Sequence, residues 1–471
     1  MHSYFSVHRK QPTTADPSPV VRTRTAKPRI VRFTNARLLR DHDLILDDLW
    51  VRDGILADPK SLFWEGALPD ETVDCGGRIL APGLIDVQIN GGWGVDFSTG
   101  GPELASGLRL VSRRLLAHGI TSFLPTVITS SLESYRAVLP QIVPTAGSPE
   151  GAAVLGVHLE GPFISPSKPG CHPPAHIIAN KGSDDKAVVG RPDALRRACG
   201  EHLAHVRLVT LAPELPGSEM LVAELLARGV VVSAGHSNAS SAQMEASLKW
   251  GVTMCTHLFN AMPPFHPREP GIVGLLGSKF QPRPFLGLIS DGVHVHPASV
   301  KLAAAARPDS IVLVSDGIVA MGLPEGQHHF GEVPVEIVSG DKAYRSGTTT
   351  LAGAVVALDE CVRRFRKYTN CSTVRALEAA SLRPAEALGM QSSKGGLHVG
   401  ADADLILLDD ELNVQATYVG GVRAWSAQEG MLEEEEMAFT TSPPRESNTS
   451  EPPPHTLGSG SRPARGSKRK K

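Results

Sequence analysis

The sequence lacks the features that mark membrane, secreted or nucleic-acid-binding proteins. No apolar run approaches the roughly 20 residues of a membrane-spanning helix, and the N-terminus has no apolar signal-peptide core. The 6 cysteines are scattered without a CxxC pair, which is typical of free thiols in a reducing compartment. The formal net charge is only −2, so the whole chain attracts neither nucleic acid nor an anionic membrane. These absences favour a cytoplasmic protein without a membrane or nucleic-acid partner.

The two ends of the chain differ from its middle. At 471 residues, the chain can hold an α/β barrel of about 250 residues, a smaller companion and terminal segments. Residues 1–28 are polar, contain proline and show no periodicity, which predicts a disordered N-terminal arm. Residues 427–471 contain a glutamate run and Ser/Pro/Thr-rich text, which predicts a disordered tail. Its basic end, SRPARGSKRKK, is compatible with nuclear localisation as well as with a solvated tail that has no function.

Two strand-rich stretches flank the middle of the chain. Residues 29–80 contain short alternating segments with turns at Asp53-Gly54 and Gly76-Gly77, and residues 395–426 show the same pattern. We expect these stretches, one from each end of the chain, to pair into one small β-sandwich.

Residues 81–394 alternate between apolar strands and helical segments. The strand candidates include VLGVHLE, VVVSAGH, VTMCTHL and IVLVSDG, and helices are predicted at 218–228, 240–250 and 372–388. Strands this continuously apolar need cover on both faces, as in parallel sheets, and repeated βα units favour a barrel. The predicted fold class is therefore α/β, a (β/α)8 TIM-like barrel with a small β-sandwich domain formed from both ends of the chain. A β-hairpin is predicted at 328–347, inserted after the last barrel strand.

Four polar side chains close four of these apolar strands. Glu160, His236, His257 and Asp316 each follow a run of apolar or small residues. The strand ends of a (β/α)8 barrel converge on one face, so we expect these side chains to lie together. Two imidazoles and one carboxylate, from His236, His257 and Glu160, suit one Zn²⁺-like ion with an open position for water. Fe²⁺, Mn²⁺ and Co²⁺ are the alternative ions.

Asp316 is predicted as the general base, with Asp291 as its rival because both lie in a Ser-Asp-Gly tripeptide. The base would take a proton from water and return it to the leaving nitrogen. Either aspartate is also an ordinary turn residue. Gln88 and Asn90 stand where a two-metal hydrolase would carry an HxH pair, and an amide is a poor metal ligand. The residues therefore predict a hydrolase with one metal ion per chain.

The motifs together resemble a known family. PGLIDVQINGG, HLEGPFISPSKPGCH, SAGHSNA, THLFNAM, REPG, DGVH, LVSDG and TLAGA follow the order found in N-acetylglucosamine-6-phosphate deacetylases of the amidohydrolase superfamily, the animal members in particular. The resemblance covers nearly everything from Ile30 to Trp425. It implies hydrolysis of N-acetyl-D-glucosamine 6-phosphate to D-glucosamine 6-phosphate and acetate, in amino-sugar catabolism. It also implies a homodimer with one divalent ion per chain, Zn²⁺ being favoured.

The resemblance implies roles for individual residues. Glu160, His236 and His257 would bind the metal, Asp316 would act as acid and base, and His172 would polarise the acetamide carbonyl. The residues implied to contact the substrate are Cys171, His172, Asn260, Ala261, Arg268, His294, Leu351, Ala352 and Gly353. Among these, Arg268 would bind the phosphate in its own or the partner subunit's site, and the segment 351–353 would line the acetyl end.

The chain departs from the family pattern at two places, and two other functions stay open. The usual SGS reads Ala352-Gly353-Ala354 and the usual TDA reads Ser315-Asp316-Gly317, which removes hydroxyl groups that could contact the substrate. One alternative is an amidohydrolase acting on another N-acylated amino sugar or a cyclic amide, without a phosphate requirement at Arg268. The other is a non-catalytic relative that binds partners through its charged tail.

Overall fold

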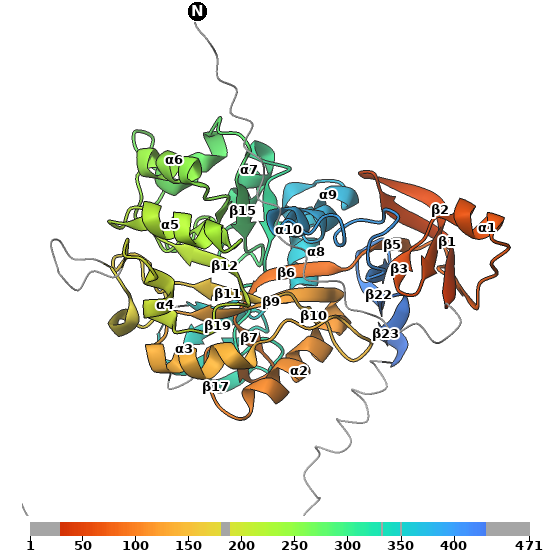
Figure 1. Ribbon diagram of the computed structural model, residues 1–471, viewed down its shortest axis with the longest axis horizontal. Coiled ribbons are helices and arrows are strands. Elements are labelled where there is room, and N and C mark those ends of the chain that lie inside the picture. The colour runs from red at the N-terminus through yellow and green to blue at the C-terminus, as the bar shows by residue number, and fades with distance from the viewer. Residues whose placement is uncertain (1–28, 180–188, 331–332, 349–350, 430–471) are drawn as a thin grey trace, which may run out of the picture. The chain divides into compact units, whose positions relative to one another are not determined.

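A computed structural model describes residues 29–179, 189–330, 333–348 and 351–429 of the chain (Figure 1). The predicted N-terminal arm and nearly all of the predicted tail, including its basic end, lie outside these residues. Eight parallel strands form a barrel. In chain order they are β6 (Leu84–Ile89), β9 (Ile120–Ile128), β11 (Val157–Glu160), β12 (Val206–Leu211), β13 (Val231–Ala234), β14 (Met254–Cys255), β15 (Phe285–Leu288) and β16 (Ile311–Leu313).

Each barrel strand lies beside its neighbours in chain order. A short extra strand, β10 (Ala153–Val154), pairs with β9, and β7 (Gly91–Gly92) pairs with β8 (Val95–Asp96) after the first barrel strand. The ring closes where the Asp316 N–H, just after β16, donates to the Gln88 carbonyl oxygen of β6 at 2.9 Å. The predicted barrel is confirmed.

The helices that follow the barrel strands bury one apolar face each. They are α2 (Leu104–Leu115), α3 (Leu132–Val138), α4 (Ala194–Cys199), α5 (Ser218–Ala227), α6 (Ser241–Trp250), α7 (Pro297–Ala306), α8 (Leu358–Thr369), α9 (Thr373–Glu378) and α10 (Leu382–Ala387). Four short 3₁₀ turns accompany them: η1 (Leu116–His118), η2 (Leu139–Gln141), η3 (Pro174–His176) and η4 (Gly271–Gly277). Helix α6 starts at a reciprocal cap between Ser240 and Gln243. No helix among the described residues has both the length and the apolar character needed to cross a membrane.

The prediction of one continuous helix at 372–388 is wrong. The segment 372–388 forms two helices, α9 and α10, rather than one. Pro384 has no N–H to donate to the preceding turn, and its ring clashes with a continuing helix, so the chain breaks and restarts just before it. Pro384 then lies in the first turn of α10, where the missing N–H costs nothing.

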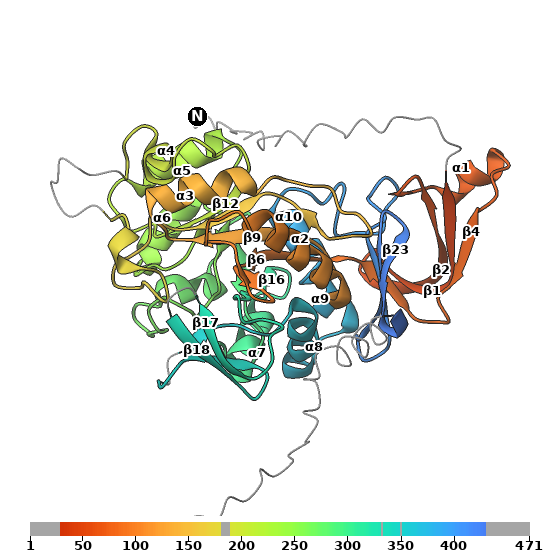
Figure 2. The same ribbon diagram turned by 90° about the horizontal axis from the view of Figure 1, so that it is seen from below.

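The two ends of the chain pair with each other, as predicted, but in one sheet where a sandwich was predicted. Its strands are β1 (Ile30–Arg40), β2 (Asp43–Arg52), β3 (Ile55–Leu56), β4 (Glu71–Asp74), β5 (Ile79–Pro82), β21 (Leu405–Leu408), β22 (Val414–Val419) and β23 (Val422–Ser426), with the helix α1 (Pro59–Trp64) after β3. Antiparallel pairing of β21 with β5 joins the two ends. Figures 1 and 2 both show the first and last coloured segments lying together. The sheet has its own buried cluster, in which the rings of Phe33 and Tyr418 meet edge to face at 5.0 Å.

The segment after Asp316 forms an antiparallel sheet of four strands where a single hairpin was predicted. The strands are β17 (Gly326–Phe330), β18 (Val333–Val338), β19 (Lys342–Arg345) and β20 (Leu351–Gly353), and Figure 2 shows β17 and β18 beside each other. After β20, Ala354 forms a bridge with Gly317, one residue past Asp316. The insertion therefore brings the segment 351–353 back to the barrel's functional face.

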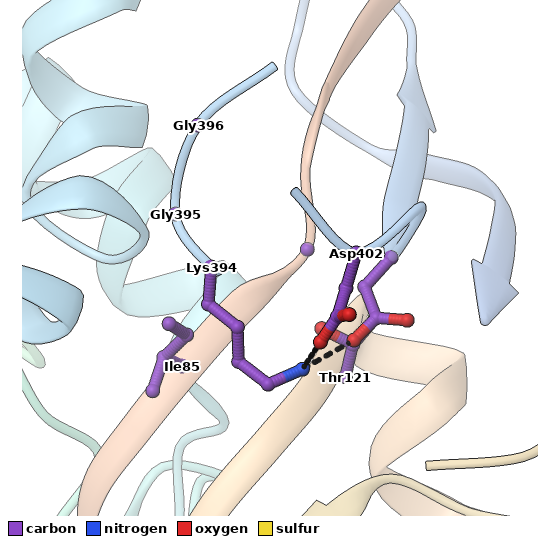
Figure 3. A pocket seen from close by; sticks show the side chains of 8 residues that line it. Ile85, Thr121, Lys394, Gly395, Gly396 and Asp402 are labelled. Carbon is purple, nitrogen blue, oxygen red and sulfur yellow. Dashed lines mark hydrogen bonds and ion pairs between the residues drawn. The ribbon is translucent and has the colours of Figure 1, made fainter. Parts of the chain in front are cut away.

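At the opposite end of the barrel, Lys394 joins the barrel to the sheet. Its Nζ lies 2.7 Å from Asp404 Oδ2 and 3.0 Å from Asp402 Oδ2, and Figure 3 shows the Lys394 side chain pointing towards Asp402. Asp404 also accepts from Gly420 N at 3.0 Å. Burial alone would lower the pKa of Lys394, but Asp404 and Asp402 outweigh it and raise that pKa. We refer to Lys394, Asp402 and Asp404 as the Lys394 cluster.

Candidate active site

The four strand-end residues predicted from the sequence lie together. Glu160 is the last residue of β11, His236 and His257 follow β13 and β14, and Asp316 follows β16. Three of them have left-handed backbone conformations, with φ of 47° at His236, 29° at His257 and 49° at Asp316. Non-glycine residues avoid this region, which costs on the order of 1–3 kcal/mol each, and such strain concentrates at functional sites.

The side chains of Glu160, His236 and His257 place one ligand atom each at the corners of a nearly equilateral triangle. Glu160 Oε1 lies 3.1 Å from His236 Nε2 and 3.0 Å from His257 Nε2, and the two nitrogens are 3.1 Å apart. A tetrahedral ion with bonds of about 2.1 Å holds its ligand atoms about 3.4 Å apart, within a few tenths of these distances. The residues therefore fit one small divalent ion.

The hydrogen bond on the far side of the His236 ring supports a cation at this triangle. His236 Nδ1 lies 2.9 Å from the Lys168 carbonyl oxygen, which can only accept, so Nδ1 carries a proton. In the neutral ring, Nε2 then aims a lone pair at Glu160 Oε1 and at His257 Nε2. A carboxylate oxygen and imidazole lone pairs this close repel one another unless positive charge lies between them. One carboxylate oxygen and two imidazole nitrogens in this arrangement are donors that a divalent metal ion accepts.

His172 extends the group of possible ligands, but its geometry suits another role. Ligand atoms of Glu160, His172 and His236 all lie within 4.8 Å of one another. His172 Nε2, however, is 3.8 Å from Glu160 Oε2, farther than the spacing in the triangle with His257. Its Nδ1 contacts Thr129 Oγ1 at 2.8 Å, and burial lowers the pKa of His172 to about 3, so the ring is neutral. A neutral ring at this position suits a hydrogen-bond donor next to the metal ligands.

The two carboxylates of the site differ in their pKa. Burial alone would raise the pKa of Glu160, but its close contacts with the His236 and His257 rings hold it well below its usual range. For Asp316, burial and then the negative charge of Glu160 raise the pKa to about 6. Asp316 is therefore the carboxylate of the pair that can take up and release a proton near neutral pH.

Gln88 and Asn90 hold Asp316 beside the triangle. Gln88 Nε2 donates to both Glu160 Oε1 at 3.0 Å and Asp316 Oδ1 at 3.2 Å, and Asn90 Nδ2 donates to Asp316 Oδ1 at 2.8 Å. The two amides occupy the places of an HxH pair, as the sequence indicated, and act as donors to carboxylates. This arrangement favours one ion over two.

Asp291, the rival base, is held by other groups. Its Oδ1 accepts the N–H groups of Val293 and His294 at 2.9 and 2.8 Å, and its Oδ2 lies 2.6 Å from His294 Nδ1. Burial alone would lower the pKa of His294, but the hydrogen bond and charge of Asp291 raise it. These contacts favour Asp316 as the base and leave Asp291 to orient His294.

The residues implied to bind substrate lie on several loops. Asn260 Nδ2 is buried and has no hydrogen-bond partner among the described residues, so a ligand could satisfy it. Cys171 Sγ lies 3.8 Å from the Leu351 carbonyl oxygen, which joins the loop after β11 to strand β20. Ala261 has a left-handed backbone at φ 48°. Arg268 is exposed, and its guanidinium makes no hydrogen bond or ion pair within the described ranges. No contact within one chain therefore holds its side chain towards a particular phosphate site.

Sequence reasoning missed the residues that support the site. The Ser315 hydroxyl donates a hydrogen bond to the Asp86 carboxylate in β6, and Ser315 Oγ accepts one from the Gly317 N–H at 3.2 Å. These two hydrogen bonds hold the turn at Asp316. Burial raises the pKa of Asp86 to about 7. Thr129 contacts His172 in the same supporting manner. A threonine or serine at a strand end is common, so no sequence signal singles these residues out.

The comparisons with known proteins agree with this geometry. The model of the amidohydrolase family matches residues 79–424, and the chain therefore belongs to that family. The N-acetylglucosamine-6-phosphate deacetylase of Homo sapiens is 51% identical over 406 residues, covering 85% of this chain and 96% of the relative. Within the amidohydrolases, the chain is a hydrolase of this deacetylase group.

A solved structure and a more distant relative show which sugars the similar proteins are named for. The structure of a mutant N-acetyl-D-glucosamine-6-phosphate deacetylase from Mycobacterium smegmatis, in complex with N-acetyl-D-glucosamine-6-phosphate, matches with a TM-score of 0.69 at 27% identity, covering 85% of this chain and 100% of that one. An N-acetylgalactosamine-6-phosphate deacetylase of Escherichia coli O157:H7 is 33% identical over 390 residues, covering 82% of this chain and 97% of the relative. The group therefore includes proteins named for two epimeric sugars.

Proposed function

We propose that this chain is a metal-dependent deacetylase that converts N-acetyl-D-glucosamine 6-phosphate and water to D-glucosamine 6-phosphate and acetate, in amino-sugar catabolism. The observation that carries the proposal is the triangle of Glu160, His236 and His257 ligand atoms, spaced 3.0–3.1 Å apart, beside the half-buried Asp316. A cation-binding triangle next to a carboxylate of raised pKa is the combination that amide hydrolysis needs.

Glu160, His236 and His257 would hold one divalent ion per chain, with Zn²⁺ favoured by the mixed oxygen and nitrogen donors. Fe²⁺, Mn²⁺ and Co²⁺ accept the same donors. When bound, such an ion lowers the pKa of a water molecule in its open position towards neutrality.

Asp316 and His172 perform the proton and hydrogen-bond steps. Asp316 accepts a proton from the attacking water and returns it to the amide nitrogen as the C–N bond breaks. His172 donates a hydrogen bond to the acetamide oxygen, where negative charge develops. Its neutral state suits this role because the Nε2–H can polarise the carbonyl without giving up its proton.

The remaining predicted residues would bind the phosphosugar. Arg268 supplies a guanidinium for the phosphate, and the backbone and amide at Asn260 and Ala261 supply further donors. His294, oriented by Asp291, binds a sugar or phosphate oxygen. Cys171 and the segment 351–353 enclose the acetyl group. In a homodimer, which we include in the proposal, the exposed Arg268 serves its own or the partner subunit's site.

Acetate release by purified protein of known metal content tests the proposal. We expect turnover of N-acetyl-D-glucosamine 6-phosphate, loss of turnover after chelation, and recovery on adding one equivalent of Zn²⁺. The 4-epimer, N-acetyl-D-galactosamine 6-phosphate, and unphosphorylated N-acetyl-D-glucosamine are the comparison substrates. A higher kcat/KM for either would replace the proposed substrate, and no acetate release from any of the three would reject the activity.

A cytoplasmic location is part of the proposal. All 6 cysteines are free, which fits a reducing compartment. Subcellular fractionation against compartment markers tests this location.

A further inference from the structure

We propose that Thr129 is a positioning residue that fixes His172 in the tautomer whose Nε2 carries the proton. The inference deepens the proposed function and rests on it, because that tautomer matters only if His172 donates to the substrate carbonyl. Histidine has two neutral tautomers, and only one of them presents an N–H on the side of the ring that faces the metal ligands.

Thr129 contacts the far side of the His172 ring with two groups. It follows directly after β9 and is fully buried. Its backbone nitrogen lies 3.3 Å from His172 Nδ1, and its Oγ1 lies 2.8 Å from the same atom. A backbone N–H can only donate, so His172 Nδ1 must be an acceptor and therefore has no proton. The neutral ring must then carry its proton on Nε2.

The threonine hydroxyl strengthens this choice. Thr129 Oγ1 has one proton and two possible acceptors, His172 Nδ1 at 2.8 Å and the Glu160 carbonyl oxygen at 3.4 Å. Because Nδ1 has no proton to give, the hydroxyl must be the donor in the shorter contact, and it shares the single lone pair of Nδ1 with the more distant backbone N–H. Two donors from one residue thus face the same ring nitrogen.

The contact on the other edge of the ring, at Nε2, favours the same tautomer. His172 Nε2 lies 3.8 Å from Glu160 Oε2. An N–H at Nε2 is attracted by this carboxylate, whereas a lone pair there would face its negative charge. Thr129 and Glu160 therefore agree, and the proton of His172 is held on the side from which a substrate oxygen could receive it.

The neighbouring backbone is shaped around Thr129. A Cβ added at Gly161 would lie 2.2 Å from Thr129 Oγ1, and Gly161 has a left-handed φ of 88°. Only glycine fits there, and its position lets the chain after Glu160 pass close to the hydroxyl.

Nuclear magnetic resonance of full-length protein labelled with ¹⁵N-histidine tests the tautomer without any substrate. The His172 signals are assigned by their loss in His172→Gln. We expect two-bond correlations to show a protonated Nε2 and an unprotonated Nδ1 in the wild-type protein. A protonated Nδ1 overturns the inference, whether or not the chain releases acetate.

Kinetics of Thr129→Val and Thr129→Ser test the consequence. Valine keeps the shape but removes the hydroxyl, so we expect kcat for acetate release to fall roughly 3- to 10-fold with little change in KM. Serine restores the hydroxyl and should restore most of kcat. Thr417→Val is the matched control, because Thr417 is equally buried and its Oγ1 donates to Leu116 O at 2.7 Å, far along the chain from His172. It should lower stability and leave kcat unchanged.

The outcomes separate this inference from the proposed function. Absent acetate release by the wild-type protein rejects the function, while the wild-type tautomer still decides what Thr129 does to His172. An active wild type with unchanged kcat in Thr129→Val, or a failure of Thr129→Ser to restore it, overturns the positioning role. If Thr129→Val does not fold, the Thr129→Ser kinetics and the wild-type spectrum still decide.

Discussion

The two ends of the barrel hold buried charges that are arranged in opposite ways. At the N-terminal ends of the strands, the ammonium of Lys394 lies between two carboxylates, with 3.0 Å as the longer of the two contacts. At the C-terminal ends, the carboxylate of Glu160 faces imidazole nitrogens, and a second carboxylate, that of Asp316, shares the donor Gln88. The carboxylates of the first group have their cation, Lys394, within the chain. The second is short of positive charge until something binds.

The backbone shows the same contrast. Beside the Lys394 cluster, the left-handed position is a glycine, Gly395 at φ 78°, which adopts it without strain. At the site, the left-handed positions are occupied by His236, His257 and Asp316. Glycine would relieve the strain there but would remove the side chains that the proposed chemistry needs. One end of the barrel is therefore built for stability, and the other keeps strain and unmatched charge for function. Substitutions at the two ends should separate these properties.

The largest expected effect is loss of the metal and of all measurable activity in His236→Ala. Two remaining ligands do not replace a set of two histidines and one glutamate. Elemental analysis should show about one ion per wild-type chain and almost none in the variant. The rise in Tm that metal gives the wild type should also disappear, because it follows from binding to the folded state. Two ions per wild-type chain would contradict a site for a single metal.

The next effect is a fall in kcat by roughly 10²–10⁴ in Asp316→Asn, the usual size of a general acid–base contribution. The variant should keep its metal, since Asp316 is not among the ligands. A base must be ionised, so wild-type activity should fall as pH drops through the pKa of Asp316. That pKa is raised to about 6, and a nearby cation moves it lower, so the acid limb should lie at or below about pH 6.

Asp291→Asn is the control for this assignment. It should weaken substrate binding through His294 and leave the acid limb in place. If Asp291→Asn abolishes that limb and Asp316→Asn keeps it, the two aspartates have been assigned in the wrong order.

At the other end of the barrel, Lys394→Met should destabilise the fold by about 3–5 kcal/mol, because it leaves the largely buried Asp404 carboxylate without its cation. The pKa of Lys394 is raised in the folded state, so its contribution is present at all pH below the ordinary lysine value. It is lost only as pH rises through the folded pKa. Denaturant unfolding measures the change, and kcat of the folded fraction should stay near wild type. A large fall in kcat would show that the two ends are coupled.

The smallest expected effect is a rise in KM of about 10- to 100-fold in Arg268→Ala, the value of one charge-assisted hydrogen bond to a phosphate. Its exposed position argues against a larger cost. Discrimination between the phosphorylated and unphosphorylated sugar should fall by the same factor. Unchanged discrimination would remove Arg268 from the phosphate site.

The sequence predicted the parts of the site that depend on a strand's end and missed those that depend on contacts across the barrel. Glu160, His236 and His257 stand out because an ionisable residue after an apolar run is unusual, and parallel strands bring such ends together. Thr129 and Asp86 act through partners such as His172 and Ser315, which lie in loops that follow other strands. Only the register between strands brings these pairs together, and a single sequence does not contain it.

The same distinction holds for the fold. The barrel and the shared sheet followed from the strand patterns, which are local. The insertion was underestimated because β20 is three residues long and ends in Gly353, too short a run to be distinguished from a loop. The break before Pro384 is different, because the proline itself is a local signal that a helix through 372–388 cannot be continuous.

The pairing of β5 with β21 has a consequence for how the protein is made. The ribosome completes β5 early and adds about 5–20 residues per second, so on the order of half a minute passes before β21 emerges. During that time the N-terminal strands have an unpaired edge, of the kind that invites pairing with another chain. The whole barrel must be synthesised before this edge is covered. Strand β5 is therefore translated before the barrel, yet the sheet that contains it can finish folding only after the barrel has been made.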